Sequence, residues 1–157
     1  MTVSPDGCFT CDVNAGRRAA PGGTIYQDDH WIADHGVDLL VRGYVVLKPK
    51  RHVHEFADLV PEEAVTFGPV LQMILAGMRR ALETERIYAC SFAETVHHLH
   101  LHLLPRYSDM PGLGPNLLPE LFAGQRWACT PAEAEKAAAL IRQELSDRVW
   151  EPADERR

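Results

Sequence analysis

The segment from Thr95 to Tyr107 reads TVHHLHLHLLPRY and holds four of the eight histidines of the chain. Three of them, His98, His100 and His102, alternate with leucines. On a β-strand, side chains two residues apart share a face, so the three imidazoles would line one face and the leucines the other. On a helix the same three side chains would spread over about 200° of arc. The spacing therefore predicts a strand with a histidine face.

Other short β-prone runs surround this segment. Those before the middle of the chain predict a meander of antiparallel strands that ends at Pro49, because proline cannot continue the hydrogen-bonded ladder. A later run is separated from the histidine strand only by Ala93 and Glu94, which predicts a tight hairpin. The predicted strands span residues 23–28, 30–35, 38–48, 86–92 and 95–105.

Two helices are predicted between and after these strands. The first begins at Pro61, with Glu62 and Glu63 at its favourable N-terminal end. The last begins at Thr130, whose hydroxyl can form a capping box with Glu133. The order of strands, helix, strand pair, loop and helix gives an α+β class. The apolar stripe of the first helix comprises Val65, Phe67, Val70, Leu71, Ile74, Leu75, Met78 and Leu82.

The length and composition fit one globular domain. A chain of 157 residues can bury a core of its own, and 46% hydrophobic with 24% charged residues are ordinary globular values. We expect a single domain over residues 1–150 and a disordered tail at 151–157. A net charge of -6 argues against broad nucleic-acid binding. The chain shows no secretory signal and no membrane-length apolar run, so we expect a cytoplasmic protein without a membrane partner.

The four cysteines divide into a close pair and two single residues. Cys90 and Cys129 are interpreted as buried small apolar residues. Cys8 and Cys11 could bind a metal or do redox chemistry. Redox chemistry would favour a helix beginning at the pair, and the residues that follow do not have a helical pattern. Structural zinc is therefore the better interpretation, and it needs two further ligands.

Three interpretations of the histidine face are open from spacing alone. The imidazoles could be half-exposed residues on a polar sheet face. They could hold a catalytic metal, since three histidines suit zinc. They could also act in nucleophilic catalysis, with one imidazole attacking and its neighbours handling protons.

The residues around this face resemble a known family. HLHLHLL, at residues 98–104, matches the pattern His-φ-His-φ-His-φ-φ with φ apolar, and Pro105 and Arg106 follow it directly. VVLKPKRHVHEFADLVPEE, at residues 45–63, is similar to the strand, Pro-Lys-x-His turn and helix entry of the same family. From about Cys8 to Arg106 the chain resembles the histidine triad (HIT) family of nucleotide hydrolases and transferases.

This resemblance implies an activity and a set of residues. His100, the middle histidine, would attack an α-phosphorus and form a nucleotidyl-imidazole intermediate that water then cleaves. His102 would contact the α-phosphate or the leaving oxygen, and Thr95 would help to hold phosphate. Arg106 follows the catalytic strand and is expected to approach phosphate as well. The implied substrate is a dinucleoside polyphosphate, a nucleoside phosphoramidate or a similar compound, with a purine expected.

The resemblance also implies a metal site and an assembly. Zinc-bearing members of the family take their ligands from positions that correspond here to Cys8, Cys11, His52 and His98. Such a structural site would join the N-terminal segment to the sheet. His54 is a possible substitute ligand, although a solvent-facing turn residue is the better interpretation. The family further implies a homodimer whose sheets join.

The chain departs from the family pattern before the triad. Many members have Gly-Gln-Ser where this chain has Ala93, Glu94 and Thr95, so Glu94 places negative charge near the site. No clear residue for holding a ribose is found, with Asp34 and Asp38 as candidates. Two other functions stay open, a zinc-dependent hydrolase with the three strand histidines as ligands, and a nucleotide-binding module without turnover. We interpret Lys48, Lys50, Arg51, His30 and His35 as surface residues.

Overall fold

The computed structural model describes residues 7–124 and 126–146. The predicted domain boundary at residue 150 and the predicted tail at 151–157 lie outside these described residues. Within them, no helix is both long and apolar enough to cross a membrane.

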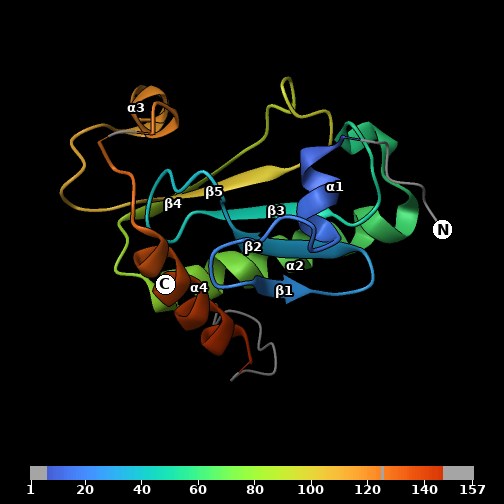
Figure 1. The fold of residues 1–157 in the computed structure, drawn as a ribbon, viewed down its shortest axis with the longest axis horizontal. Coiled ribbons are helices and arrows are strands. Elements are labelled where there is room, and N and C mark those ends of the chain that lie inside the picture. The colour runs from blue at the N-terminus through green and yellow to red at the C-terminus, as the bar shows by residue number, and fades with distance from the viewer. Residues whose placement is uncertain (1–6, 125, 147–157) are drawn as a thin grey trace, which may run out of the picture.

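A five-stranded antiparallel sheet forms the centre of the molecule (Figure 1). The first three strands form the expected meander, and the fifth strand lies between the third and the fourth. A sheet of this kind with packed helices confirms the predicted α+β class. The strands are β1 (Thr24–Gln27), β2 (Trp31–His35), β3 (Val45–Pro49), β4 (Arg86–Cys90) and β5 (Leu101–Arg106).

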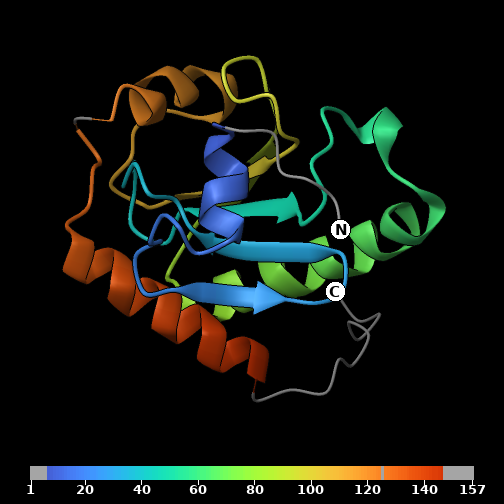
Figure 2. The ribbon, with the colours of Figure 1, turned by 45° about the vertical axis from the view of Figure 1, so that its right-hand side comes forward.

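Helices lie on both sides of this sheet. Figure 2 shows the first helix across one face of the sheet, the helix at Pro61–Ala81 behind the other face, and the C-terminal helix below the first strand. The main core lies under the long helices, where buried side chains such as Ile74 and Ile141 meet Leu47 and Leu103 of the sheet. The helices are α1 (Phe9–Asn14), α2 (Pro61–Ala81), α3 (Leu118–Phe122) and α4 (Pro131–Ser146), and short 3-10 helices span Phe56–Asp58 and Gly114–Asn116.

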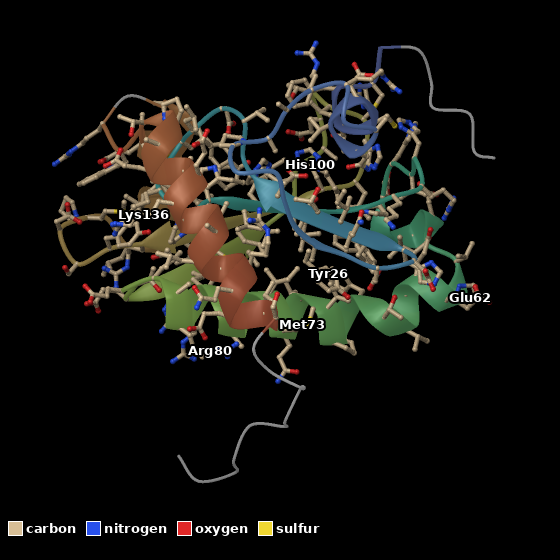
Figure 3. All side chains as sticks on the ribbon, turned by 60° about the horizontal axis from the view of Figure 1, so that its bottom comes forward. Tyr26, Glu62, Met73, Arg80, His100 and Lys136 are labelled. Atoms are coloured by element: carbon tan, nitrogen blue, oxygen red, sulfur yellow. The ribbon has the colours of Figure 1, made fainter. Side chains whose placement is uncertain are left out.

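The strand register decides which side chains face away from the main core. Asp34 is paired with Val46, and Val46 with His102, so these three residues form one row across the sheet. Because side chains alternate between faces, Leu47 and Leu101 point into the core on the opposite side. His100, two residues before His102, lies on the side of the sheet away from α2, as its position relative to Met73 shows (Figure 3).

Both predicted long helices are confirmed, with their expected starts. The backbone N–H of Val60 donates to the Glu63 carboxylate over 3.1 Å at the start of α2. At α4, the Glu133 N–H donates to the Thr130 hydroxyl, and the Thr130 N–H donates to the Glu133 carboxylate. This is the predicted capping box. The apolar stripe is wrong at one position, because Val65 is 75% exposed.

Two of the predicted strands begin several residues too early. Residues 38–44 form turns rather than strand, so β3 begins only at Val45. β4 and β5 pair antiparallel, as the predicted hairpin requires, but its tight turn at Ala93 and Glu94 is wrong, because residues 91–100 form a loop and β5 begins at Leu101. The reason lies in the backbone: the Leu99 N–H donates to the Val53 carbonyl, which draws this segment away from β4.

Candidate functional site

A cleft of about 500 Å³ lies on the face of the sheet away from the long helices. Its walls come from α1, β2, β3, the loop at residues 92–96, and Phe122 of α3. His100 and His102 both line it. Their ring centroids are 4.7 Å apart with the rings nearly perpendicular. The cleft therefore brings two of the three alternating histidines together.

The hydrogen bond of His100 fixes which of its nitrogens can react. Its Nδ1 lies 2.6 Å from the backbone carbonyl of His98. A carbonyl oxygen can only accept, so Nδ1 carries the proton of the neutral ring. The lone pair is then on Nε2, and that nitrogen is available for nucleophilic attack.

His102 is enclosed more fully than His100. Its Nδ1 lies 2.6 Å from the hydroxyl of Tyr44, and its ring packs against those of Phe92 and Phe122 with centroid separations of 5.9 Å and 5.0 Å. Burial lowers the pKa of His102 to about 4. His102 is therefore neutral at pH 7.

Of the other two predicted phosphate contacts, Thr95 lies in the cleft and Arg106 does not. Thr95 lines the same cleft as the two histidines, beside Glu94. Arg106 does not reach the cleft, and this prediction is corrected. It lies four residues beyond His102, about 13 Å along the strand, and its Nη2 is 4.0 Å from the Glu85 carboxylate.

A buried ion pair forms part of the cleft floor. Lys48 Nζ donates to the two Asp34 carboxylate oxygens over 2.9 Å and 2.8 Å, and both side chains are almost fully buried. The interpretation of Lys48 as a surface charge is therefore wrong. Asp34 already holds a cation, whereas Asp38, the other ribose candidate, lines the cleft without a described ion pair. A buried ion pair of this kind contributes little to the free energy of folding. Because both residues line the cleft, the pair makes its floor polar.

A second cluster lies behind the cleft, where α1 meets the turn after β3. Cys8, Cys11, His52 and His98 have their ligand atoms within 4.8 Å of one another. The Cys8 Sγ is 3.7 Å from His98 Nδ1, and the Cys11 Sγ is 3.4 Å from the Nδ1 atoms of both histidines. The four predicted ligand positions, from three separate parts of the chain, therefore meet.

The geometry of this cluster fits tetrahedral zinc. With Zn–S near 2.3 Å and Zn–N near 2.05 Å, the sulfur-to-nitrogen edge of a tetrahedron is about 3.6 Å. The three sulfur-to-nitrogen distances agree with that length. His98 Nε2 donates to the Pro49 carbonyl over 3.0 Å, which leaves its Nδ1 lone pair directed at the sulfurs. Burial also lowers the pKa of His98 to about 4, so the ring is in the neutral form that a metal requires.

Three further predictions, on the helix at the cysteine pair, on His54 and on His35, can be compared with the structure. A helix does begin at the cysteine pair, because Cys8 caps α1 and its sulfur accepts from the Cys11 N–H. The predicted lack of a helix was therefore wrong, and the case against redox chemistry depends on the two histidines beside the thiols. His54 is exposed, as expected for a turn residue. His35 is fully buried instead of on the surface, and its ring links Gly36 to Gly43.

Sequence reasoning missed the aromatic residues of the cleft, among them Tyr44 and Phe122. Tyr44 belongs to no motif considered in the sequence, and only its contact with His102 draws attention to it. Phe122 lies just after the Pro- and Gly-rich loop predicted at residues 108–120, and α3 brings its ring to within 5.6 Å of Phe92, measured between centroids. Neither residue has a sequence signal, because both reach the site through folding of distant segments.

Comparison with known proteins gives a consistent result. The family model described as HIT domain matches residues 17–109, more than half of the chain. Protein hit of Bacillus subtilis (strain 168) is 24% identical over 114 residues, which covers 69% of this chain and 77% of the relative. The matched residues include His52 and the whole triad, whereas the cysteine pair lies before them.

Solved structures agree on the fold. A Zn-bound histidine triad family protein from Mycobacterium smegmatis superposes with a TM-score of 0.68 and 24% identity, over 90% of this chain and 94% of that one. Plasmodium falciparum diadenosine triphosphate hydrolase in complex with cyclomarin A gives a TM-score of 0.60 with 16% identity, over 80% and 77% of the two chains. At these identities the likeness shows a shared fold.

Proposed function

The chain belongs to the HIT domain family, and on this premise we propose that it is a nucleotide hydrolase or nucleotidyl transferase. The reaction cleaves a bond at the α-phosphate of a dinucleoside polyphosphate, a nucleoside phosphoramidate or a similar compound. One observation carries the proposal: the bond from His100 Nδ1–H to the His98 carbonyl leaves the Nε2 lone pair available beside a second neutral histidine in one cleft.

His100 acts as the nucleophile. Its Nε2 lone pair forms a bond to the α-phosphorus, and the bond from phosphorus to the leaving group breaks with its electron pair on the leaving atom. Water or another acceptor then attacks the same phosphorus, and the P–N bond returns its electron pair to Nε2. Imidazole suits both steps, because its ring nitrogen is a good nucleophile and the ring is a good leaving group.

Thr95 helps to hold the phosphate during these steps, and His102 contacts the phosphate or the leaving oxygen. Both residues line the cleft with His100, and each can donate a hydrogen bond to an oxygen on the phosphorus. Phe9, Phe92 and Phe122 supply aromatic surface for the nucleoside or for an aromatic leaving group. Glu94 adds negative charge to the same wall and disfavours highly anionic leaving groups.

Cys8, Cys11, His52 and His98 would hold one structural zinc ion. Their sulfur-to-nitrogen distances fit tetrahedral coordination, and four protein ligands leave no open position for chemistry. When bound, zinc would cross-link α1, the turn after β3 and the start of the histidine segment. The His98 carbonyl, which orients His100, belongs to a residue of this cluster.

The catalytic-zinc alternative is not favoured. It requires His98, His100 and His102 to converge on one ion, but His98 Nδ1 is directed at the cysteine sulfurs. The nucleotide-binding module without turnover stays the second candidate, for which Glu94 is the hint.

A homodimer is part of the same proposal. β4 is an edge strand of the sheet, and an edge offers unpaired backbone groups to a second copy. Joining two sheets along this edge would satisfy those groups. The purine preference and the cytoplasmic location stay predictions.

A substrate screen with trapping of the intermediate tests the proposal. The purified protein would be mixed with labelled dinucleoside polyphosphates and nucleoside phosphoramidates and quenched rapidly in alkaline denaturant, because a phosphorus-to-imidazole bond is labile in acid. We expect turnover of at least one compound and label on the peptide that contains His100. A His97→Ala variant should retain the label, since His97 is exposed and outside the cleft lining. Nucleotide binding without turnover or label across the screen would favour the binding module.

A further inference from the structure

The hydroxyl of Tyr44 occupies an unusual position for a tyrosine. The side chain is only 2% exposed, and its ring lies nearly parallel to that of His102, with the centroids 5.8 Å apart. Among the residues that the structure describes, His102 Nδ1 is the one hydrogen-bond partner of this hydroxyl, at 2.6 Å. The direction of this single bond decides where the His102 proton resides.

The hydroxyl must be the donor. Burial raises the pKa of Tyr44, so the phenol keeps its proton throughout the neutral range. If His102 Nδ1–H donated instead, that phenolic proton would be buried without an acceptor, which is unfavourable. With Tyr44 donating, Nδ1 holds a lone pair and the ring proton is on Nε2. His102 thus has the opposite tautomer to His100, whose proton is on Nδ1.

The position of Tyr44 is fixed by the turn before β3. The Gly36 N–H donates to the Tyr44 carbonyl over 2.9 Å, and a Cβ on Gly36 would overlap the Tyr44 ring. The buried His35 ring donates from Nδ1 to the Gly36 carbonyl and accepts at Nε2 from the Gly43 N–H. These contacts hold the phenol against His102 and restrict its movement.

We propose that Tyr44 is a positioning residue that fixes His102 as an Nε2–H donor, so that His102 gives a hydrogen bond to the leaving-group oxygen while His100 attacks. The inference rests on the proposed function of the cleft. His102 keeps its proton in this role, because transfer would create an imidazolate. The electron pair of the breaking P–O bond stays on the leaving oxygen, where the N–H stabilises the developing charge.

This assignment has a kinetic consequence that a purely structural role lacks. A hydrogen bond to the leaving oxygen matters most when that oxygen develops much charge, as in a poor leaving group. A p-nitrophenyl ester of a nucleoside monophosphate has a good leaving group and needs little help. Loss of Tyr44 control should therefore lower kcat selectively for the poor leaving group.

Tyr44→Phe tests the proposal, with Tyr107→Phe as the matched control. Tyr107 also donates its hydroxyl to a single described partner, the Arg42 carbonyl, but it lies outside the cleft. For Tyr44→Phe we expect kcat on a nucleoside alkyl phosphodiester, a poor leaving group, to fall about tenfold, the effect of one hydrogen bond. KM and p-nitrophenyl ester turnover should change little, and Tyr107→Phe should resemble the unaltered protein on both substrates.

Nitrogen-15 NMR of the histidine rings shows which ring nitrogen carries the proton, and this measurement does not require a substrate that the protein turns over. The unaltered protein should show His102 protonated at Nε2, identified by the loss of its signals in His102→Gln, and Tyr44→Phe should show a mixture of tautomers. A proton on Nδ1 in the unaltered protein would overturn the inference, as would equal kinetics of the two tyrosine variants on both substrates. A protein without turnover would instead refute the proposed function, and the spectrum would still decide the tautomer.

Discussion

The cluster of Cys8, Cys11, His52 and His98 and the cleft each contain a histidine of the same segment, and these two histidines, two positions apart in the chain, have opposite ring tautomers. His98 has its ring proton on Nε2, which donates to Pro49, and its Nδ1 lone pair is directed at sulfur. His100 has its proton on Nδ1, and its Nε2 lone pair is free for attack. The difference comes from one backbone carbonyl for each ring. The role of an imidazole here is therefore determined by the acceptor that its N–H finds.

The two regions also differ in what connects them to the fold. The cluster joins three distant parts of the chain, so its disruption should act mainly on stability. The cleft histidines are enclosed by Tyr44, Phe92 and Phe122, so their replacement should act mainly on chemistry. Substitutions on each side can separate the two effects.

The largest expected effect comes from replacing each of the two histidines in turn by alanine. His100→Ala should lower turnover at least about a thousandfold, the scale for loss of a nucleophile, while the zinc content stays near one per chain. His98→Ala should lose zinc and lower the melting temperature. Turnover and metal analysis of both variants provide the check. Loss of zinc in His100→Ala, or full turnover by it, would remove the distinction between the two regions.

The second effect concerns the thiols of the cluster. Cys8→Ser with Cys11→Ser should lose the metal and lower the melting temperature by roughly 10 °C or more, because structural zinc contributes several kcal/mol to folding. Cys129→Ser is the control, since its half-buried thiol lies outside the cluster. Calorimetry with metal analysis measures both. Zinc retained by the double variant would show that these thiols are not the ligands.

The third effect tests how firmly the turn before β3 supports the cleft. Gly36→Ala should destabilise the protein by about 1–3 kcal/mol, because the added methyl group overlaps the Tyr44 ring. Turnover should fall as well, since Tyr44 contacts His102. Gly68→Ala is the control: beyond its chain neighbours its Cβ meets nothing within 4 Å, and the helix preference for alanine is offset by crowding from Pro69, so we expect a change below about 1 kcal/mol. Similar denaturation midpoints for the two variants would contradict this account.

The smallest effect is a pH dependence from the cleft. Burial lowers the pKa of His102 to about 4, whereas an unfolded histidine titrates near 6.5. Between these two pH values the unfolded chain binds more protons than the folded protein. The contribution of neutral His102 to the free energy of unfolding is therefore full above pH 6.5 and is lost as the pH falls toward 4. The stability of His102→Gln should therefore improve relative to the unaltered protein as the pH falls from 7 to 5, by less than about 1.4 kcal/mol per pH unit. Denaturant titrations at each pH measure this difference, and a constant gap would contradict it.

Local patterns in the sequence predicted the long helices and the general class. α2 begins at Pro61 and α4 at Pro131, directly after the capping residue Thr130, because proline and the capping pair act within one turn of chain. The strands were placed correctly, but with extended ends. The tight turn at Ala93 was wrong because the Leu99 N–H donates to the carbonyl of Val53, a partner far away in sequence. Local propensity contains no information about such a partner.

Residue identity and spacing by themselves determined that this chain carries a triad of alternating histidines and a separate cysteine pair. Only the tertiary structure decided which nitrogen of each ring faces which group, and that Arg106 lies beside Glu85 instead of in the cleft. It also decided that Lys48 is buried on Asp34 and that Tyr44 reaches His102. The physical reason is that protonation, burial and hydrogen bonding depend on partners from other strands and turns. The alternation of side chains along a strand requires no partner, so the sequence alone could reveal it.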